Sequence, residues 1–248
     1  MTTILAYFRF CIFAIATFSL YAAWWLFSFV VPNKQSWRQF VFGKWSRVFQ
    51  IISGMKIKVV GNVPKPPFFL VTNHVSYVDV PALNLATGGI FVAKKDIEDW
   101  PMIGPIIRDM GVVFIDRSNR RDIPRAGEQI LKKLNDNEGV IVFPEGVSAK
   151  GDEVKPFHSS FFEFASRADL DVSYAALIYE TPENGPPPSE TVCWWNDISF
   201  LSHLIRLLKL RSFTATIKFG DVPVRNSNRK ILAKELHEKV EERFAPMQ

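Results

Sequence analysis

The sequence PFFLVTNHVSYVD, residues 67–79, decides the fold class, because an apolar run in it leads directly into polar residues. The run has the length and composition of a buried strand. His74 follows the predicted strand and Asp79 comes five positions later. Chemistry in α/β proteins gathers at the carboxyl ends of strands, and a histidine oriented by a carboxylate accepts a proton from a hydroxyl near neutral pH. A satisfied structural histidine is the alternative interpretation of the same spacing.

After Gly54, predicted strands and helices alternate along the chain. Apolar runs predict strands at residues 56–60, 67–72, 90–93, 112–115, 140–143 and 172–178, with two more at 192–195 and 213–219. Helical patterns are found at residues 36–53, 79–86, 123–135, 159–167 and 227–244. This order predicts an α/β fold with one mostly parallel or mixed central sheet flanked by helices, preceded by a membrane-associated helical segment.

The N-terminal segment has the composition of a membrane helix. Residues 10–33 carry no charged side chain, and a span needs about 20 apolar residues. Two tryptophans inside the run, at positions 24 and 25, make a simple perpendicular span less certain. More positive charge follows the run than precedes it, which places its C-terminal side in the cytoplasm. A cleaved signal peptide is the competing interpretation, disfavoured by the poor charged region at the N-terminus. We therefore expect a bacterial-type inner-membrane protein whose catalytic part faces the cytoplasm.

The predicted helix at residues 36–53 is amphipathic. Its apolar stripe leaves Arg38, Lys44 and Arg47 largely off the stripe, and Gly54 ends the pattern. A helix lying on an anionic bilayer surface and a helix packing on the core both explain the pattern. The expected organisation is an N-terminal anchor with an interfacial helix over residues 1–54, and a catalytic domain over residues 55–248.

Composition narrows the classes of partner. The formal net charge is +5, and the 248 residues include 22 Phe and 7 Trp. A basic chain favours anionic partners, and its aromatic N-terminus favours membrane lipid over nucleic acid. The two cysteines and four histidines are dispersed, so we expect no metal site and no cofactor.

Two further strand ends carry polar groups. GVVFIDR, residues 111–117, ends in Arg117, whose guanidinium can hold a phosphate with two parallel hydrogen bonds. VIVFPEG, residues 140–146, ends around Glu145, a carboxylate that could bind substrate hydroxyls or pair with a cation. Taken singly, each is explained as well by a surface arginine or a turn glutamate. If the strands are parallel neighbours, His74, Arg117 and Glu145 meet along one edge of the sheet.

Together these segments resemble the glycerolipid acyltransferase superfamily, which includes the 1-acylglycerol-3-phosphate acyltransferases. The motifs Asn-His-x4-Asp, Gly-x-x-Phe-Ile-Asp-Arg and Phe-Pro-Glu-Gly occur in this order, beginning at Asn73, Gly111 and Phe143. The resemblance covers roughly residues 59–178 and implies that His74 and Asp79 are catalytic. The substrate-binding residues that it implies are Asn73, Lys94, Phe114, Arg117, Glu145 and Gly146.

The resemblance implies a membrane-bound enzyme of phospholipid biosynthesis. It would move an acyl group from acyl-CoA or acyl-carrier protein to the free hydroxyl of a lysophospholipid, without an acyl-enzyme. The acceptor expected first is 1-acylglycerol-3-phosphate (lysophosphatidic acid), giving phosphatidic acid. The third motif departs from many relatives, because Val147-Ser148 stands where they have Thr-Arg. That departure makes lyso-ornithine lipid the alternative acceptor. An inactive membrane-anchored lipid-binding protein and a thioester or lipid hydrolase are the alternatives from other classes.

Overall fold

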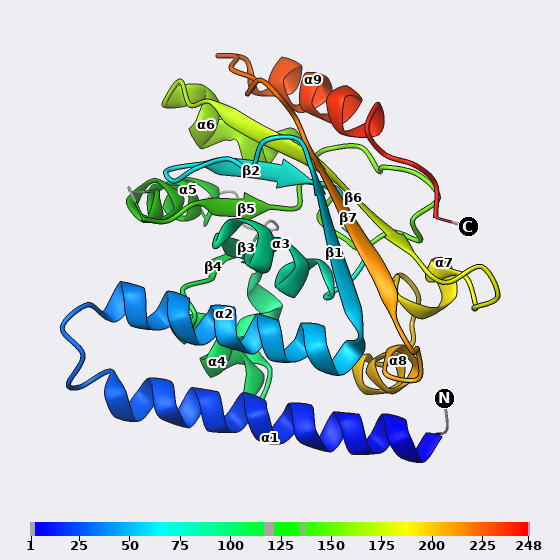
Figure 1. Cartoon of the computed structure of the whole chain (residues 1–248). Helices are drawn as coiled ribbons and strands as arrows, with labels where there is room; N and C mark the ends of the chain where they lie inside the picture. Colours follow the sequence, from blue (N-terminus) through cyan, green and yellow to red (C-terminus); the bar gives the residue numbers. More distant parts are fainter. Residues whose placement is uncertain (1–2, 117–121, 135–136, 248) are drawn as a thin grey trace.

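The computed structural model describes residues 3–116, 122–134 and 137–247. Its described part contains one seven-stranded sheet in the order β1-β7-β6-β2-β5-β3-β4. The strands are β1 (Met55–Val60), β2 (Phe69–Thr72), β3 (Ile90–Lys94), β4 (Val113–Ile115), β5 (Val140–Val142), β6 (Val172–Glu180) and β7 (Phe213–Phe219). The sheet runs through the centre of the molecule (Figure 1).

Strand direction makes the sheet mixed. Strands β6, β2, β5, β3 and β4 are parallel to one another, whereas β7 is antiparallel to β6 and pairs in parallel with β1. The carboxyl ends of β2, β5, β3 and β4 therefore lie at one edge of the sheet. The predicted α/β class is confirmed, and the edge is the place where such folds bind ligands.

Helices cover both faces of the sheet (Figure 1). The α-helices are α1 (Thr3–Phe27), α2 (Lys34–Ser53), α3 (Asp79–Thr87), α4 (Ile103–Asp109), α5 (Asp122–Lys133), α6 (Glu163–Arg167), α7 (Pro188–Thr191), α8 (Phe200–Leu207) and α9 (Arg229–Glu241). Two 3₁₀ helices are η1 (Lys95–Asp99) and η2 (Ser159–Phe162). One apolar core joins a sheet face to α1, α2, α3 and α8, and the other joins the opposite face to α5, α6 and α9.

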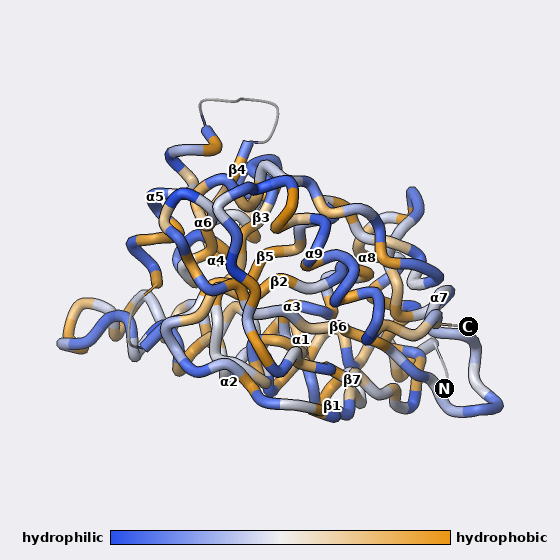
Figure 2. The backbone as a smooth tube through the Cα atoms, turned by 90° about the horizontal axis from the view of Figure 1, so that it is seen from above, coloured by the Kyte–Doolittle hydropathy of each residue, from blue (hydrophilic) through white to orange (hydrophobic). Residues whose placement is uncertain are grey.

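Alternating side chains on β2 connect the two cores. Leu70 packs on the side of α1 and α2, whereas Phe69 and Val71 pack on the side of α5 and α9. Successive residues of a strand point to opposite faces, so a strand buried on both faces is apolar throughout. Figure 2 shows this as hydrophobic colouring along the central strands β2, β3 and β5, against largely hydrophilic outer loops.

Two predicted elements differ from the structure. Residues 192–195 do not form a strand, because α7 ends at Thr191 and an irregular segment follows. This segment is apolar because it packs beside the loop after β2, where the backbone N–H of Trp194 donates to the carbonyl oxygen of Val75 over 2.7 Å. The helix predicted at 159–167 is divided, since η2 precedes α6 and the two meet at Glu163.

Arg38 is buried, contrary to its expected place off the apolar stripe of α2. Its side chain is 8% exposed and its Nη2 atom lies 2.5 and 2.7 Å from the two carboxylate oxygens of Glu138, which is 1% exposed. A second nitrogen donates to the carbonyl oxygen of Met110 over 2.9 Å. Helix α2 therefore packs on the core of the chain, as one of the two interpretations of its pattern predicted. The domain division at residues 54 and 55 stays a prediction.

Candidate active site

The imidazole of His74 and the carboxylate of Asp79 are in direct contact at the end of β2. His74 Nδ1 lies 2.7 Å from Asp79 Oδ2. The His74 side chain is 22% exposed and Asp79 is fully buried. The ring of His74 stacks on Phe143, with centroids 4.1 Å apart and planes 18° from parallel. The carboxylate and Phe143 together fix the ring orientation and leave Nε2 as the nitrogen available to a substrate.

Local backbone geometry places Asp79. It is the first residue of α3, and the loop before it folds so that the N–H groups of Val75 and Ser76 donate to Asp79 Oδ2 over 2.9 and 3.1 Å. A carboxylate at a helix N-terminus is favoured by the unpaired N–H groups there. The five-residue spacing of the motif is thus one tight loop closed on its own carboxylate.

Asn73 lies beneath this loop and is 1% exposed. Its side-chain amide pairs with the backbone of Leu177 on β6: Nδ2 donates to the carbonyl oxygen over 2.9 Å, and Oδ1 accepts from the N–H over 2.7 Å. Both polar groups of Asn73 are therefore occupied by the neighbouring strand. This geometry continues the pairing of β2 with β6 beyond Thr72, and the role of Asn73 in substrate binding stays a prediction.

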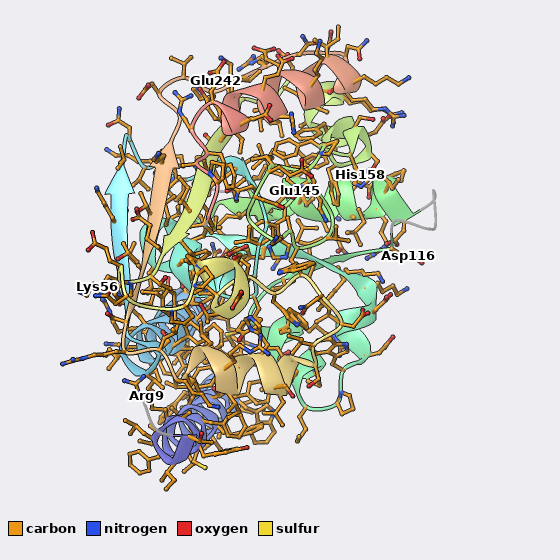
Figure 3. All side chains as sticks on the ribbon, turned by 90° about the vertical axis from the view of Figure 1, so that its right-hand side faces the viewer. Arg9, Lys56, Asp116, Glu145, His158 and Glu242 are labelled. Atoms are coloured by element: carbon orange, nitrogen blue, oxygen red, sulfur yellow. The ribbon has the colours of Figure 1, made fainter. Side chains whose placement is uncertain are left out.

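Glu145 also supports His74, through a hydrogen bond to its backbone. Its carboxylate is 2% exposed and accepts the backbone N–H of His74 over 2.8 Å and that of Lys155 over 3.3 Å. Figure 3 shows Glu145 in the interior of the molecule. Burial raises the pKa of Glu145 to about 8, although the two N–H donors act in the opposite direction. The third motif therefore holds the backbone of the first one in place.

A cavity of about 640 Å³ opens beside His74. Its size lies within the range of roughly 300–1,000 Å³ that is common for ligand sites. The lining includes Phe143, Gly146 and Ser148 together with His74, and most of its other residues are apolar. Residues contributed to the walls by α1 and α2 are Phe10, Phe13, Ala14, Thr17, Phe18, Leu20, Tyr21, Val41, Phe42, Trp45 and Phe49. An apolar chain with a reactive end near His74 matches this arrangement.

Helix α1 is fixed against the rest of the molecule along its length. The guanidinium of Arg9 donates to the carbonyl oxygen of Leu210 over 2.9 Å, and the hydroxyl of Tyr21 donates to Asp109 over 2.9 Å. Between them, Trp45 of α2 donates to the hydroxyl of Thr17 over 3.1 Å. Figure 1 shows α1 running beside α2. One side of α1 therefore closes the cavity.

The remaining predicted substrate residues have different positions. Lys94 and Gly146 line the cavity, and Lys94 forms an ion pair with Asp96. Phe114 is buried in β4. Arg117 lies outside the described residues, so the predicted meeting of His74, Arg117 and Glu145 is seen for His74 and Glu145.

Sequence reasoning missed two residues at the site. Phe143 was noted as part of a motif but not as the ring beneath His74. Tyr179, near the end of β6, donates its hydroxyl to Asp79 Oδ1 over 2.8 Å. It lies 100 residues from Asp79 in a strand without a motif, so no sequence signal pointed to it. Within the described ranges, no group of three or more His, Cys, Asp or Glu side chains has the geometry of a metal site.

Comparisons with known proteins identify the family and the fold. The acyltransferase family pattern matches residues 56–179, half of the chain. A lyso-ornithine lipid O-acyltransferase from Rhizobium meliloti is 28% identical over 210 residues, covering 79% of this chain and 72% of the relative. A 1-acyl-sn-glycerol-3-phosphate acyltransferase from Neisseria gonorrhoeae is 31% identical over 149 residues, covering 59% and 56%. The crystal structure of the acyltransferase PlsC from Thermotoga maritima has the same fold, with a TM-score of 0.69, 22% identity and coverage of 96% and 94%.

Proposed function

Because this chain belongs to the acyltransferase family, and is an O-acyltransferase that acts on lysolipids, we propose that His74 is the general base that transfers an acyl group to the free hydroxyl of a lyso-ornithine lipid. The single observation that carries the proposal is the contact between His74 and Asp79 beside the apolar cavity that His74 lines. Donation from Nδ1 to Asp79 leaves the Nε2 lone pair free to accept a proton.

The proposed reaction needs one proton transfer in each direction. Nε2 of His74 takes the proton of the acceptor hydroxyl, and the hydroxyl oxygen attacks the carbonyl carbon of an acyl thioester. The carbon–sulfur bond then breaks, and the thiolate takes the proton back from Nε2. Asp79 stabilises the imidazolium between the two steps. The thioester is acyl-CoA or acyl-carrier protein, and the apolar cavity takes a fatty chain.

The third motif supports the choice of acceptor. Ser148 stands where many relatives carry an arginine, and its hydroxyl donates to the carbonyl oxygen of Trp194. A guanidinium suited to a phosphate is therefore replaced by a neutral hydroxyl already in use. The relative from Rhizobium meliloti also covers more of both chains than the relative from Neisseria gonorrhoeae. Together these observations reverse the order expected from the motifs and make 1-acylglycerol-3-phosphate the second candidate.

We also propose a membrane location, which the surface of α1 supports. Within the described chain, α1 is a helix long and apolar enough to cross a membrane. Its outward side exposes Ile4, Phe8, Ile15 and Trp25, while its inward side closes the cavity. We place this outward side against the inner bacterial membrane, with the catalytic domain of residues 55–248 on the cytoplasmic side. The amphipathic donor and acceptor then meet the cavity at the bilayer surface.

The test is a competition assay with the purified full chain in mixed micelles. Equal amounts of lyso-ornithine lipid and lysophosphatidic acid are offered with acyl-CoA or with acyl-carrier protein, and products are measured by mass spectrometry. We expect mainly the diacylated ornithine lipid. Mainly phosphatidic acid would establish the second candidate, and free fatty acid alone would indicate a hydrolase.

Two histidine variants test the base. His74→Ala should reduce transfer by at least about a hundredfold, within the usual contribution of general-base catalysis. His237→Ala is the matched control, because the Nε2–H of this histidine donates to the Val154 carbonyl oxygen on the opposite face of the sheet. Equal activity of His74→Ala and wild type would remove His74 from the mechanism.

A further inference from the structure

Tyr179 reaches the catalytic pair from a distant strand. Its hydroxyl lies 2.8 Å from Asp79 Oδ1, the oxygen that does not face His74. Asp79 Oδ2 meanwhile receives Nδ1 of His74 and the N–H groups of Val75 and Ser76. The two carboxylate oxygens of Asp79 thus have different hydrogen-bond donors. Among these donors, Tyr179 alone lies outside the loop between β2 and α3.

The direction of this hydrogen bond is fixed by burial. Tyr179 is 1% exposed, and burial raises the pKa of its phenol well above its usual range, so the hydroxyl stays protonated. Asp79 is fully buried and has no access to water. A hydrogen bond to a buried charge is stronger than one between neutral groups. The phenol therefore donates, and the carboxylate accepts.

The strand that carries Tyr179 is itself attached to the catalytic loop. Asn73, the neighbour of His74, pairs with both backbone groups of Leu177, two residues before Tyr179. The loop and the strand are therefore joined twice. Asn73 is hydrogen-bonded to Leu177 of β6, and Tyr179 of the same strand is hydrogen-bonded to Asp79. Because β6 is a long buried strand, the hydroxyl has little freedom to move. Together, these hydrogen bonds define the plane of the Asp79 carboxylate relative to His74.

We propose that Tyr179 is a positioning residue for acyl transfer, which turns the Asp79 carboxylate so that Oδ2 faces His74 Nδ1. The inference rests on the proposed function of His74 and adds a residue to it. Without the Tyr179 hydroxyl, Oδ1 of the buried Asp79 carboxylate has lost its hydrogen-bond donor, and the carboxylate rotates toward another donor. Rotation misdirects Oδ2 and lowers the fraction of His74 rings held in the productive orientation.

The first experiment measures kcat and KM of Tyr179→Phe, which keeps the ring and removes the hydroxyl. We expect kcat to fall roughly ten- to a hundredfold, the equivalent of one hydrogen bond to a charged group. KM for both substrates should change by less than about twofold, because the cavity lining excludes Tyr179. The matched control is Tyr174→Phe, on the same strand but packed into the opposite core, and its kcat should remain within about twofold of wild type.

A double-variant cycle distinguishes positioning from a loss of folding. In Asp79→Asn the group that Tyr179 positions has already been altered, so adding Tyr179→Phe should reduce kcat by less than about threefold. An equal loss in both backgrounds, or wild-type kcat in Tyr179→Phe, would overturn the inference. If wild type itself transfers no acyl group to either acceptor, the proposed function fails first and the inference falls with it.

Discussion

Replacing Glu145 by Gln tests how the third motif supports His74, the proposed general base. Glutamine has nearly the same shape and keeps an oxygen that can accept the backbone N–H of His74, now 2.8 Å from Glu145, while its NH2 group replaces the oxygen that accepts the longer, 3.3 Å hydrogen bond from Lys155. It removes the titrating group. Wild type and variant should therefore differ in how stability depends on pH, more than in structure.

The sign follows from the direction of the pKa shift. The pKa of Glu145 is raised from 4.5 to about 8 by burial, so between these values the folded protein holds a proton that the unfolded chain has lost. A raised pKa contributes stability that is complete below the unfolded value and disappears as the pH rises through the folded value. Each pH unit between them costs ~1.4 kcal/mol, so wild type should lose about 3 kcal/mol from pH 5.5 to 7.5 because of this group.

The assay is urea unfolding of the full chain in detergent micelles at pH 5.5, 6.5 and 7.5, followed by tryptophan fluorescence. Other titrating groups affect wild type and Glu145→Gln alike, so the difference between their free energies of unfolding isolates Glu145. That difference should move by about 3 kcal/mol in favour of the variant as the pH rises. Parallel curves, within ~0.5 kcal/mol, would refute the reasoning and mean that the two N–H donors keep Glu145 ionised despite its burial.

Three further variants address packing, the cavity and the acceptor. Arg38→Met should lower the free energy of unfolding by about 3–5 kcal/mol because it leaves the buried Glu138 carboxylate unpaired, and Arg38→Met with Glu138→Leu should recover most of that loss in urea titrations. Ala14→Phe, which fills part of the cavity, should reduce the preference for long over short acyl donors at least about tenfold, since even one misplaced methylene is worth ~1–3 kcal/mol; an unchanged chain-length profile would place the acyl chain elsewhere. Ser148→Arg should raise kcat/KM for lysophosphatidic acid about tenfold relative to lyso-ornithine lipid, because a charge-assisted hydrogen bond is worth ~1.5–3 kcal/mol; no change in that ratio would separate this position from acceptor choice.

Local patterns in the sequence predicted the fold class, and the ordered motifs pointed to the contact between His74 and Asp79. Apolar runs of strand length marked β2 and β5, because a strand covered on both faces has no polar side. The spacing between His74 and Asp79 likewise reflects a short loop, in which the N–H groups of Val75 and Ser76 donate to Asp79 a few residues later. The same logic failed at residues 192–195, where an apolar run covers a loop instead of joining the sheet.

The tertiary structure alone decided the contacts that cross the chain. Arg38 pairs with Glu138, 100 positions away in the sequence, and Tyr179 is hydrogen-bonded to Asp79 over the same separation. No local sequence pattern distinguishes these four side chains from the residues beside them. Helix α1 likewise has the composition of a membrane span, yet one side of it closes a cavity. Periodicity reports which residues avoid water. Which of them meet depends on how the strands are ordered in the sheet, and that order is set by packing of the whole chain.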